Sequence, residues 1–220
     1  MKDNPLASTG MLTERNSSAF LGSCAIYVKP ELALTAAHCV RHLQPSDIKV
    51  ILPAWEGTAD VLAVHCHPRA DLAILRIKHD PVEYASLLPE LPFSGLGNLT
   101  GVGADFCAYG FPEFQAWDDD KPEATGRLFK GHIQRLFTYK DHTKNYEYVA
   151  GEMSIPSPRG LSGGPLFLAD DPDKLIGIAA ANIYSSTPGE IEGTVSYGVA
   201  VLLWIVQVWL DDFVRAVPRA

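Results

Sequence analysis

The 220-residue sequence lacks any apolar run long enough to cross a bilayer, and it has only four cysteines. Its most apolar segment, residues 199–210, falls far short of the roughly 20 residues that a transmembrane helix needs. Residues 1–5 contain no apolar core of the kind found in a secretory signal. Four cysteines in a chain of this length do not constitute a disulfide framework. We therefore expect a cytoplasmic protein that neither spans nor binds a membrane.

An excess of positive charge is also missing. The chain has 18 Lys and Arg residues against 26 Asp and Glu residues, a formal net charge of −8. Nucleic acids and anionic membrane surfaces carry charge of the same sign and repel such a protein. Nucleic acid is therefore not an expected partner.

The sequence shows no metal-binding pattern of the right spacing. The trio His65-Cys66-His67 has suitable ligand types, but strand alternation sends the two histidines to one face and the cysteine to the other. A protein zinc site needs three or four converging side chains. We expect neither a metal ion nor an organic cofactor.

Short apolar segments interrupted by glycine and proline predict an all-β domain. The hydrophobic content of 47% and the chain length suit one large domain with a sizeable core. After residue 202 apolar residues recur at helical spacing, which predicts an amphipathic helix over residues 202–217. The expected strands are 19–28, 32–35, 47–52, 61–65, 72–77, 105–109, 126–137, 146–151, 165–168, 175–181 and 194–201, with a helical turn at 36–42.

Ser162 lies in the glycine-rich stretch Gly160-Leu161-Ser162-Gly163-Gly164-Pro165-Leu166, directly before an expected strand. A serine hydroxyl becomes a nucleophile only when a base takes its proton and N–H groups receive the developing oxyanion. The same pattern also describes the nucleophile elbow of α/β-hydrolases, whose histidine follows the serine. No histidine follows Ser162 in this chain, which excludes that fold.

Two segments before Ser162 contain a matching base and acid. Thr35-Ala36-Ala37-His38-Cys39 is a small-residue turn after an apolar strand. Asp71-Leu72-Ala73-Ile74-Leu75 places an aspartate at the head of an apolar run. The chain order His, Asp, Ser is that of the chymotrypsin-type arrangement.

These three segments resemble the histidine, aspartate and serine motifs of trypsin-like (chymotrypsin-fold) serine peptidases. The resemblance extends from about Phe20 to the C-terminal helix. It implies two six-stranded antiparallel β-barrels with a C-terminal α-helix and the site between the barrels. On this basis we expect a single peptidase domain: a first barrel over about residues 15–80, a linker over 81–103, a second barrel over 104–201 and the helix over 202–217.

The resemblance also implies a role for each site residue. Ser162 becomes the nucleophile, His38 the general base and then acid, and Asp71 the group that orients His38. The backbone N–H groups of Gly160 and Ser162 form the oxyanion hole. The implied reaction is hydrolysis of peptide bonds through an acyl-enzyme, and the implied partner is a protein or peptide substrate.

The chain departs from secreted digestive enzymes at the residue before the nucleophile. That residue is Leu161, where those enzymes have an aspartate that pairs with a newly released N-terminus. No Ile-Val-Gly-Gly-like sequence occurs near the start. The stretch Asp105-Phe106-Cys107-Ala108-Tyr109-Gly110-Phe111-Pro112 is instead similar to bacterial trypsin-like peptidases, including HtrA-type protease domains. Activation by a zymogen ion pair is not expected, and a partner protein is a possible activator.

A second departure concerns substrate selection. Pro156 stands six residues before Ser162, where a trypsin has an acidic residue that binds basic side chains. We therefore expect a preference for small or apolar residues rather than Lys or Arg. The segment Ala180-Ala181-Asn182 is the expected strand edge for the substrate backbone.

The leading hypothesis is a serine endopeptidase that acts inside the cell in processing or regulation. One alternative is a pseudoprotease that uses the same groove only to bind peptides. Another is an esterase that uses the same three residues. Cys24 and Cys39 either pair, as half-cystines near these positions do in secreted relatives, or remain two small buried thiols.

Overall fold

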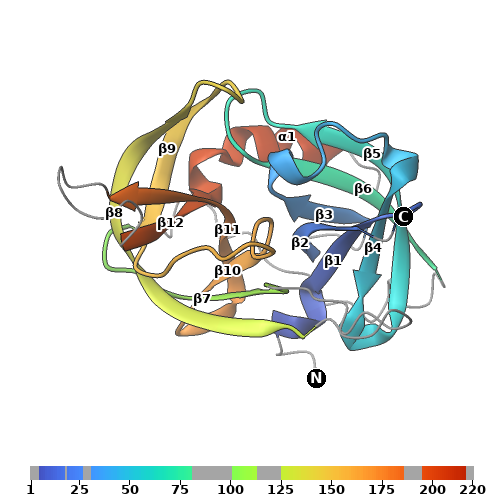
Figure 1. Ribbon diagram of the computed structural model, residues 1–220, viewed down its shortest axis with the longest axis horizontal. Coiled ribbons are helices and arrows are strands. Elements are labelled where there is room, and N and C mark those ends of the chain that lie inside the picture. The colour runs from blue at the N-terminus through green and yellow to red at the C-terminus, as the bar shows by residue number, and fades with distance from the viewer. Residues whose placement is uncertain are drawn as a thin grey trace.

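The computed structural model describes residues 5–17, 19–26, 31–80, 101–112, 125–185 and 195–216. The strands in these ranges form two closed six-stranded antiparallel barrels, which lie side by side in Figure 1. The predicted fold class, all-β with two barrels and a C-terminal helix, is confirmed. None of the helices in the described ranges is both long and apolar enough to cross a membrane.

The first barrel has the strand order β1-β2-β3-β6-β5-β4. Strand β1 is not predicted from the sequence, because five of its six residues are buried and no alternation of apolar and polar residues marks it. It closes the barrel by pairing with both β2 and β4. The strands are β1 (Thr9–Glu14), β2 (Phe20–Ile26), β3 (Leu32–Thr35), β4 (Ile48–Leu52), β5 (Gly57–Cys66) and β6 (Ala73–Asp80).

The second barrel has the order β10-β11-β12-β9-β8-β7. Strands β8 and β11 are longer than predicted, because their polar outer ends continue the pairing without an apolar pattern. The strands are β7 (Asp105–Gly110), β8 (Arg127–Asp141), β9 (Tyr146–Met153), β10 (Pro165–Leu168), β11 (Asp171–Ser185) and β12 (Val195–Leu202).

The C-terminal helix α1 (Gln207–Ala216) is shorter than the predicted 202–217. Residue 202 still pairs within β12, and the 3-10 turn η6 (Leu203–Ile205) separates strand from helix. The helix packs on the first barrel, where the Phe213 ring lies 4.7 Å from the His65 ring. The other 3-10 turns in the described parts of the chain are η1 (Pro5–Ser8), η2 (Ala37–Cys39), η3 (Pro45–Asp47) and η4 (Pro53–Trp55).

Two apolar cores support the fold. One fills the second barrel and includes Phe106, Leu161 and Ile176. The other runs from the first barrel across the junction to Leu210 of α1. The expected linker over residues 81–103 lies largely outside the described residues. The three predicted site segments each border a strand: η2 follows β3, Asp71 precedes β6, and Ser162 precedes β10.

Candidate active site

His38 and Asp71 form a direct pair within the first barrel. His38 Nδ1 lies 2.7 Å from Asp71 Oδ2, and the His38 backbone N–H donates to Asp71 Oδ1 at 2.9 Å. The Asp71 side chain is only 2% exposed, whereas 25% of the His38 side chain remains accessible. Two contacts to one carboxylate fix the ring orientation and leave Nε2 as the nitrogen available for proton transfer.

His67 shapes the turn that presents Asp71, a role that sequence reasoning missed. Its Nδ1 accepts hydrogen bonds from the backbone N–H groups of Arg69 at 3.1 Å and Ala70 at 2.8 Å. Burial lowers the pKa of His67, which favours the neutral ring that can accept these bonds. The available signal was the spacing His-Pro-x-x-Asp, in which a turn side chain can cap its own backbone.

No metal centre forms around these histidines. Within the described ranges, His, Cys, Asp and Glu side chains do not gather in groups of three or more that could hold a metal ion. The His67 ring instead makes an edge contact with Trp209 of α1, at 5.0 Å between ring centroids.

The nucleophile loop, residues 160–164, is held by backbone hydrogen bonds. The N–H groups of Leu161, Gly163 and Gly164 donate to the carbonyls of Pro158, Ala179 and Leu161 at 2.9, 2.8 and 2.8 Å, respectively. Among the described residues, the N–H groups of Gly160 and Ser162 donate to no acceptor. These are the two donors that the sequence analysis assigns to the oxyanion hole.

The Ser162 hydroxyl points toward β11 and not toward His38. Its Oγ donates to the Ala180 carbonyl at 3.5 Å, and no bond to His38 forms among the described atoms. A β-bulge between Ala179 and Ala181 directs that carbonyl toward the serine. In structures without substrate, catalytic hydrogen bonds are often long or misaligned and tighten only when substrate binds.

Cys39 contacts two of the three predicted catalytic residues. Its Sγ is 3.6 Å from His38 Nε2 and 4.0 Å from the Ser162 carbonyl oxygen. The thiol therefore contacts the nitrogen through which His38 would act on Ser162. The sequence predicts for Cys39 only a half-cystine or a buried thiol, and not this contact with His38.

The surroundings of His38 favour its charged form. Burial disfavours the imidazolium, but the hydrogen bond to Asp71 and the contact with Cys39 outweigh it and raise the pKa of His38 above its ordinary value. Cys24 and Cys39 are both free thiols in this structure. Burial raises the pKa of Cys24 to about 12, so this thiol stays neutral.

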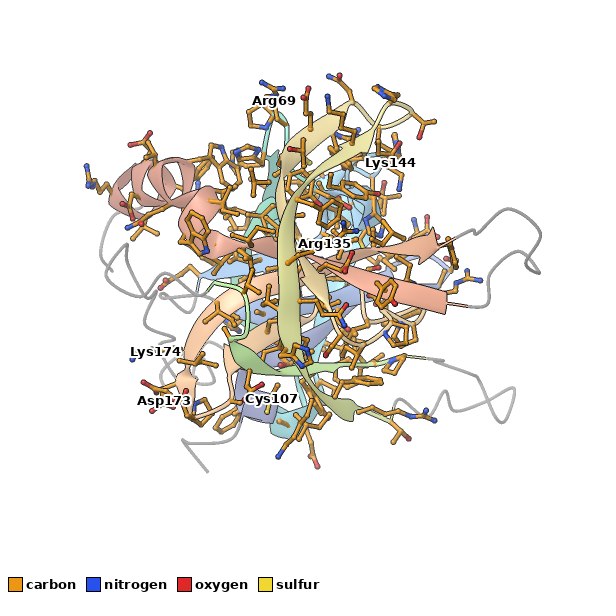
Figure 2. All side chains as sticks on the ribbon, turned by 90° about the vertical axis from the view of Figure 1, so that its left-hand side faces the viewer. Arg69, Cys107, Arg135, Lys144, Asp173 and Lys174 are labelled. Carbon is orange, nitrogen blue, oxygen red and sulfur yellow. The ribbon has the colours of Figure 1, made fainter. Side chains whose placement is uncertain are left out.

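The β8–β9 hairpin of the second barrel contacts the first barrel beside the segments that contain His38 and Asp71. Arg41 Nη1 donates to the Lys144 carbonyl at 2.9 Å, and its guanidinium lies 4.7 Å from the Tyr146 ring centroid. The Glu147 N–H donates to the Arg69 carbonyl at 3.0 Å. Figure 2 shows Arg69 and Lys144 at the same end of this hairpin. The hairpin thereby couples the His38 and Asp71 segments to the second barrel.

Two buried tyrosines of the same hairpin lie close enough to Asp71 to feel its charge. Tyr146 and Tyr148 are 3% and 7% exposed. Burial, reinforced by the negative charge of Asp71, raises the pKa of both phenols. The hydroxyls therefore remain neutral, and water has little access to the buried side of Asp71.

The residues expected to select substrate lie on two facing segments. Pro156 is exposed, whereas Ala180 and Ala181 lie on β11, where Ala180 is buried. Asn182 reaches across from β11 to the loop before the nucleophile. Its Nδ2 donates to the Ser157 carbonyl at 2.5 Å, and its Oδ1 accepts from the Ser157 N–H at 2.6 Å. Sequence reasoning assigned Asn182 to the strand edge but did not anticipate this bridge.

Comparison with known families assigns the chain to one of them. Residues 22–178 match the trypsin-like peptidase domain. The chain belongs to the trypsin-like peptidase family. The predicted relationship to this family is thereby confirmed, and it supports the predicted class of enzyme, a serine protease. The comparison with curated proteins finds no significant match.

Solved structures similar to this trypsin-like peptidase share its fold at low identity. The inactivated protease paralogue S-I1 of the scabies mite has 16% identity and a TM-score of 0.68, covering 98% of this chain and 97% of that one. The Rv3671c protease of M. tuberculosis, in an inactive form, has 17% identity and a TM-score of 0.65, with 94% and 89% covered. The HtrA-type protease AlgW, solved with a decapeptide, has 18% identity and a TM-score of 0.62, with 96% and 65% covered.

Proposed function

We propose that this trypsin-like peptidase hydrolyses peptide bonds through an acyl-enzyme formed on Ser162. The observation that carries the proposal is the pairing of His38 Nδ1 with Asp71 Oδ2 at 2.7 Å, together with a serine loop in which two N–H groups donate no hydrogen bond among the described residues. In the first step Ser162 Oγ attacks the peptide carbonyl and its proton passes to His38 Nε2. The Gly160 and Ser162 N–H groups receive the oxyanion. His38 then protonates the leaving amine. Water, deprotonated by His38, attacks the acyl-enzyme in the same way, and the carboxylic acid product leaves as Ser162 regains its proton.

The Ser162 hydroxyl must turn from Ala180 toward His38 before this step. Rotation about the Cα–Cβ bond of Ser162 redirects the hydroxyl between staggered positions. Asp71 stabilises the imidazolium that forms. No metal or organic cofactor takes part in the proposed steps.

The open edge of β11 supports extended binding of a peptide substrate. Pairing with β10 reaches Ile178, and the nucleophile loop bonds to Ala179. Beyond this point, that edge of β11 has no strand partner among the described residues, and it lies next to Ser162. A peptide can therefore add there as a further antiparallel strand. The structurally similar HtrA-type protease AlgW was solved with a decapeptide.

The Asn182–Ser157 bridge supports selectivity for small residues at the cleaved bond. It links β11 to the loop before the nucleophile, beside the position of the attacked carbonyl. Next to it, Gly198 leaves no room for a side chain, since an added Cβ would lie 2.8 Å from the Ile155 carbonyl oxygen. We expect cleavage after Gly, Ala or Ser, and Asn182→Ala to admit larger residues in a peptide-library digest. Efficient cleavage after Phe or Arg by the wild type would contradict this selectivity.

Selectivity of this kind fits limited processing of particular proteins rather than general digestion. The four free thiols fit a reducing compartment such as the cytoplasm. Cell fractionation with an antibody against the chain tests this location, and recovery outside the cytoplasm would exclude it.

The proposed activity is tested by labelling with a fluorophosphonate probe. The wild type should form a covalent adduct and Ser162→Ala should not. His38→Ala should label far more slowly while remaining folded. A folded wild type without a Ser162-dependent adduct would contradict the enzymatic proposal.

A peptide-binding role without catalysis is the second candidate, and the Ser162 bond to Ala180 favours it. An activating partner that reorients the hydroxyl would convert this state into an enzyme. Matched amide and ester substrates separate a peptidase from an esterase. Peptide binding by calorimetry, without product and without an adduct, would identify the binding role.

A further inference from the structure

Ser23 of β2 contacts the nucleophile loop at two places, although it belongs to the other barrel. Its Oγ donates to the Gly160 carbonyl at 2.9 Å, and its backbone N–H donates to the Ser162 carbonyl at 2.8 Å. The side chain is fully buried, with 0% exposure. The same hydroxyl accepts a bond from the Phe111 N–H at 3.2 Å, so its donor and acceptor are both used.

These contacts complete the restraint of two peptide units. In the unit joining residues 160 and 161, the carbonyl accepts a hydrogen bond from Ser23 Oγ and the N–H donates to the Pro158 carbonyl. In the unit joining residues 162 and 163, the carbonyl accepts from the Ser23 backbone N–H and the N–H donates to the Ala179 carbonyl. Each unit is thus held at both ends. These two peptide units alternate along the chain with the two units whose N–H groups, those of Gly160 and Ser162, donate no hydrogen bond within the described part of the chain and would form the oxyanion hole.

Close packing removes the remaining freedom of the loop. Gly160 has φ +97°, and a Cβ at this position would lie 2.6 Å from the Phe111 carbonyl oxygen. Ser23 itself is held by Thr35, whose Oγ1 donates to the Ser23 carbonyl at 2.8 Å. The loop therefore rests on a preformed support from the first barrel.

Leu161 explains why such a support is needed. Its side chain lies in the apolar core and offers no charge that could anchor the loop from another segment. Donors to an oxyanion accelerate the reaction only when they are fixed before the charge develops. Resting on the proposed function, we infer that Ser23 is a positioning residue that holds the oxyanion hole in its productive shape.

The effect should be specific to the transition state. Ser23→Ala leaves the Gly160 carbonyl and the Phe111 N–H without their buried partner. We expect kcat to fall by about 10- to 100-fold with little change in KM, because the hole acts on the developing charge and not on the bound substrate. Binding of a peptide aldehyde, which forms a tetrahedral adduct, should weaken in proportion to kcat/KM.

Ser154→Ala is the matched control. Its Oγ also accepts a backbone N–H bond, from His132 at 2.9 Å, but makes no hydrogen bond to residues 160–164 among the described residues. This variant should keep wild-type kcat and aldehyde affinity. Ser23→Cys retains the shape with a weaker donor and should give an intermediate kcat, which keeps the test decisive if Ser23→Ala does not fold.

The outcomes separate the inference from the proposed function. Absence of a Ser162-dependent fluorophosphonate adduct in the wild type defeats the proposed function. If the wild type is labelled but folded Ser23→Ala keeps wild-type kcat and aldehyde affinity, only the role of Ser23 is contradicted. Where the alanine variant does not fold, the same result in Ser23→Cys contradicts that role. A rise in KM at constant kcat likewise contradicts positioning of the oxyanion hole.

Discussion

The Cys39 thiol lies 3.6 Å from Nε2 of His38, the nitrogen that would accept the serine proton. Together with Asp71, it raises the pKa of His38 against the opposing effect of burial. A general base acts only when neutral, so the acidic limb of the pH–activity profile should lie above the ordinary histidine value of about 6.5.

Removing the thiol should move that limb. Cys39→Ala deletes one contribution that raises the pKa of His38, so half-maximal kcat should occur at lower pH than in the wild type. The measurement is kcat against pH with a small-residue peptide. Cys107→Ala, on β7 at the end of the molecule away from Arg69 (Figure 2), is the control and should leave the limb unchanged. An unshifted limb in Cys39→Ala would show that the thiol does not act on His38.

Gly163 should tolerate no side chain. At φ +84°, an added Cβ would lie 2.0 Å from the Ser23 carbonyl oxygen and 2.2 Å from Thr35 Oγ1. Gly103→Ala is matched, since Gly103 has φ +86° with nothing within 4 Å. We expect Gly103→Ala to cost about 1 kcal/mol of unfolding free energy from backbone strain alone. Gly163→Ala should lose several-fold more unfolding free energy, measured by urea unfolding, and should not react with the fluorophosphonate probe. Equal losses of unfolding free energy in the two variants would contradict the clash.

Leu161 should reject the aspartate found in zymogen-type enzymes. Its side chain is fully buried among apolar groups, so Leu161→Asp introduces an unpaired carboxylate into the core. We expect a loss of about 3–5 kcal/mol in unfolding free energy. Leu161→Met conserves volume and should cost less than about 1.5 kcal/mol. A stable, active Leu161→Asp protein would mean that the chain supplies a cationic partner.

The two arginines that contact the β8–β9 hairpin should differ in their contributions. Arg69 and Glu147 have side chains 65% and 45% exposed, so Arg69→Ala should cost less than about 1 kcal/mol. Arg41 combines a bond to the Lys144 carbonyl with a contact to the Tyr146 ring, and Arg41→Ala should cost about 1–2 kcal/mol. It should also lower kcat, because the hairpin encloses Asp71. Thermal unfolding and steady-state kinetics check both, and the reverse order would contradict the role of Arg41.

Local patterns predicted the parts of the fold that depend on neighbouring residues. Strands β3 and β10 have the predicted bounds, since each is a short apolar run ended by turn residues. Strand β1 was missed because burial on both faces removes the alternation that marks a strand. The ends of β8 and β11 were missed because exposed polar residues pair there through backbone atoms, which no side-chain pattern reports.

The sequence by itself named His38, Asp71 and Ser162 as the candidate site and determined the family, because each motif concentrates its chemistry in a few adjacent residues. Only the tertiary structure decided what surrounds them. Ser23 and Gly160 are 137 positions apart, and barrel packing alone brings the hydroxyl to that carbonyl. The Asn182–Ser157 bridge and the approach of Cys39 to His38 likewise depend on how loops meet. Such contacts follow from the relative placement of segments, which a linear pattern of residue types does not encode.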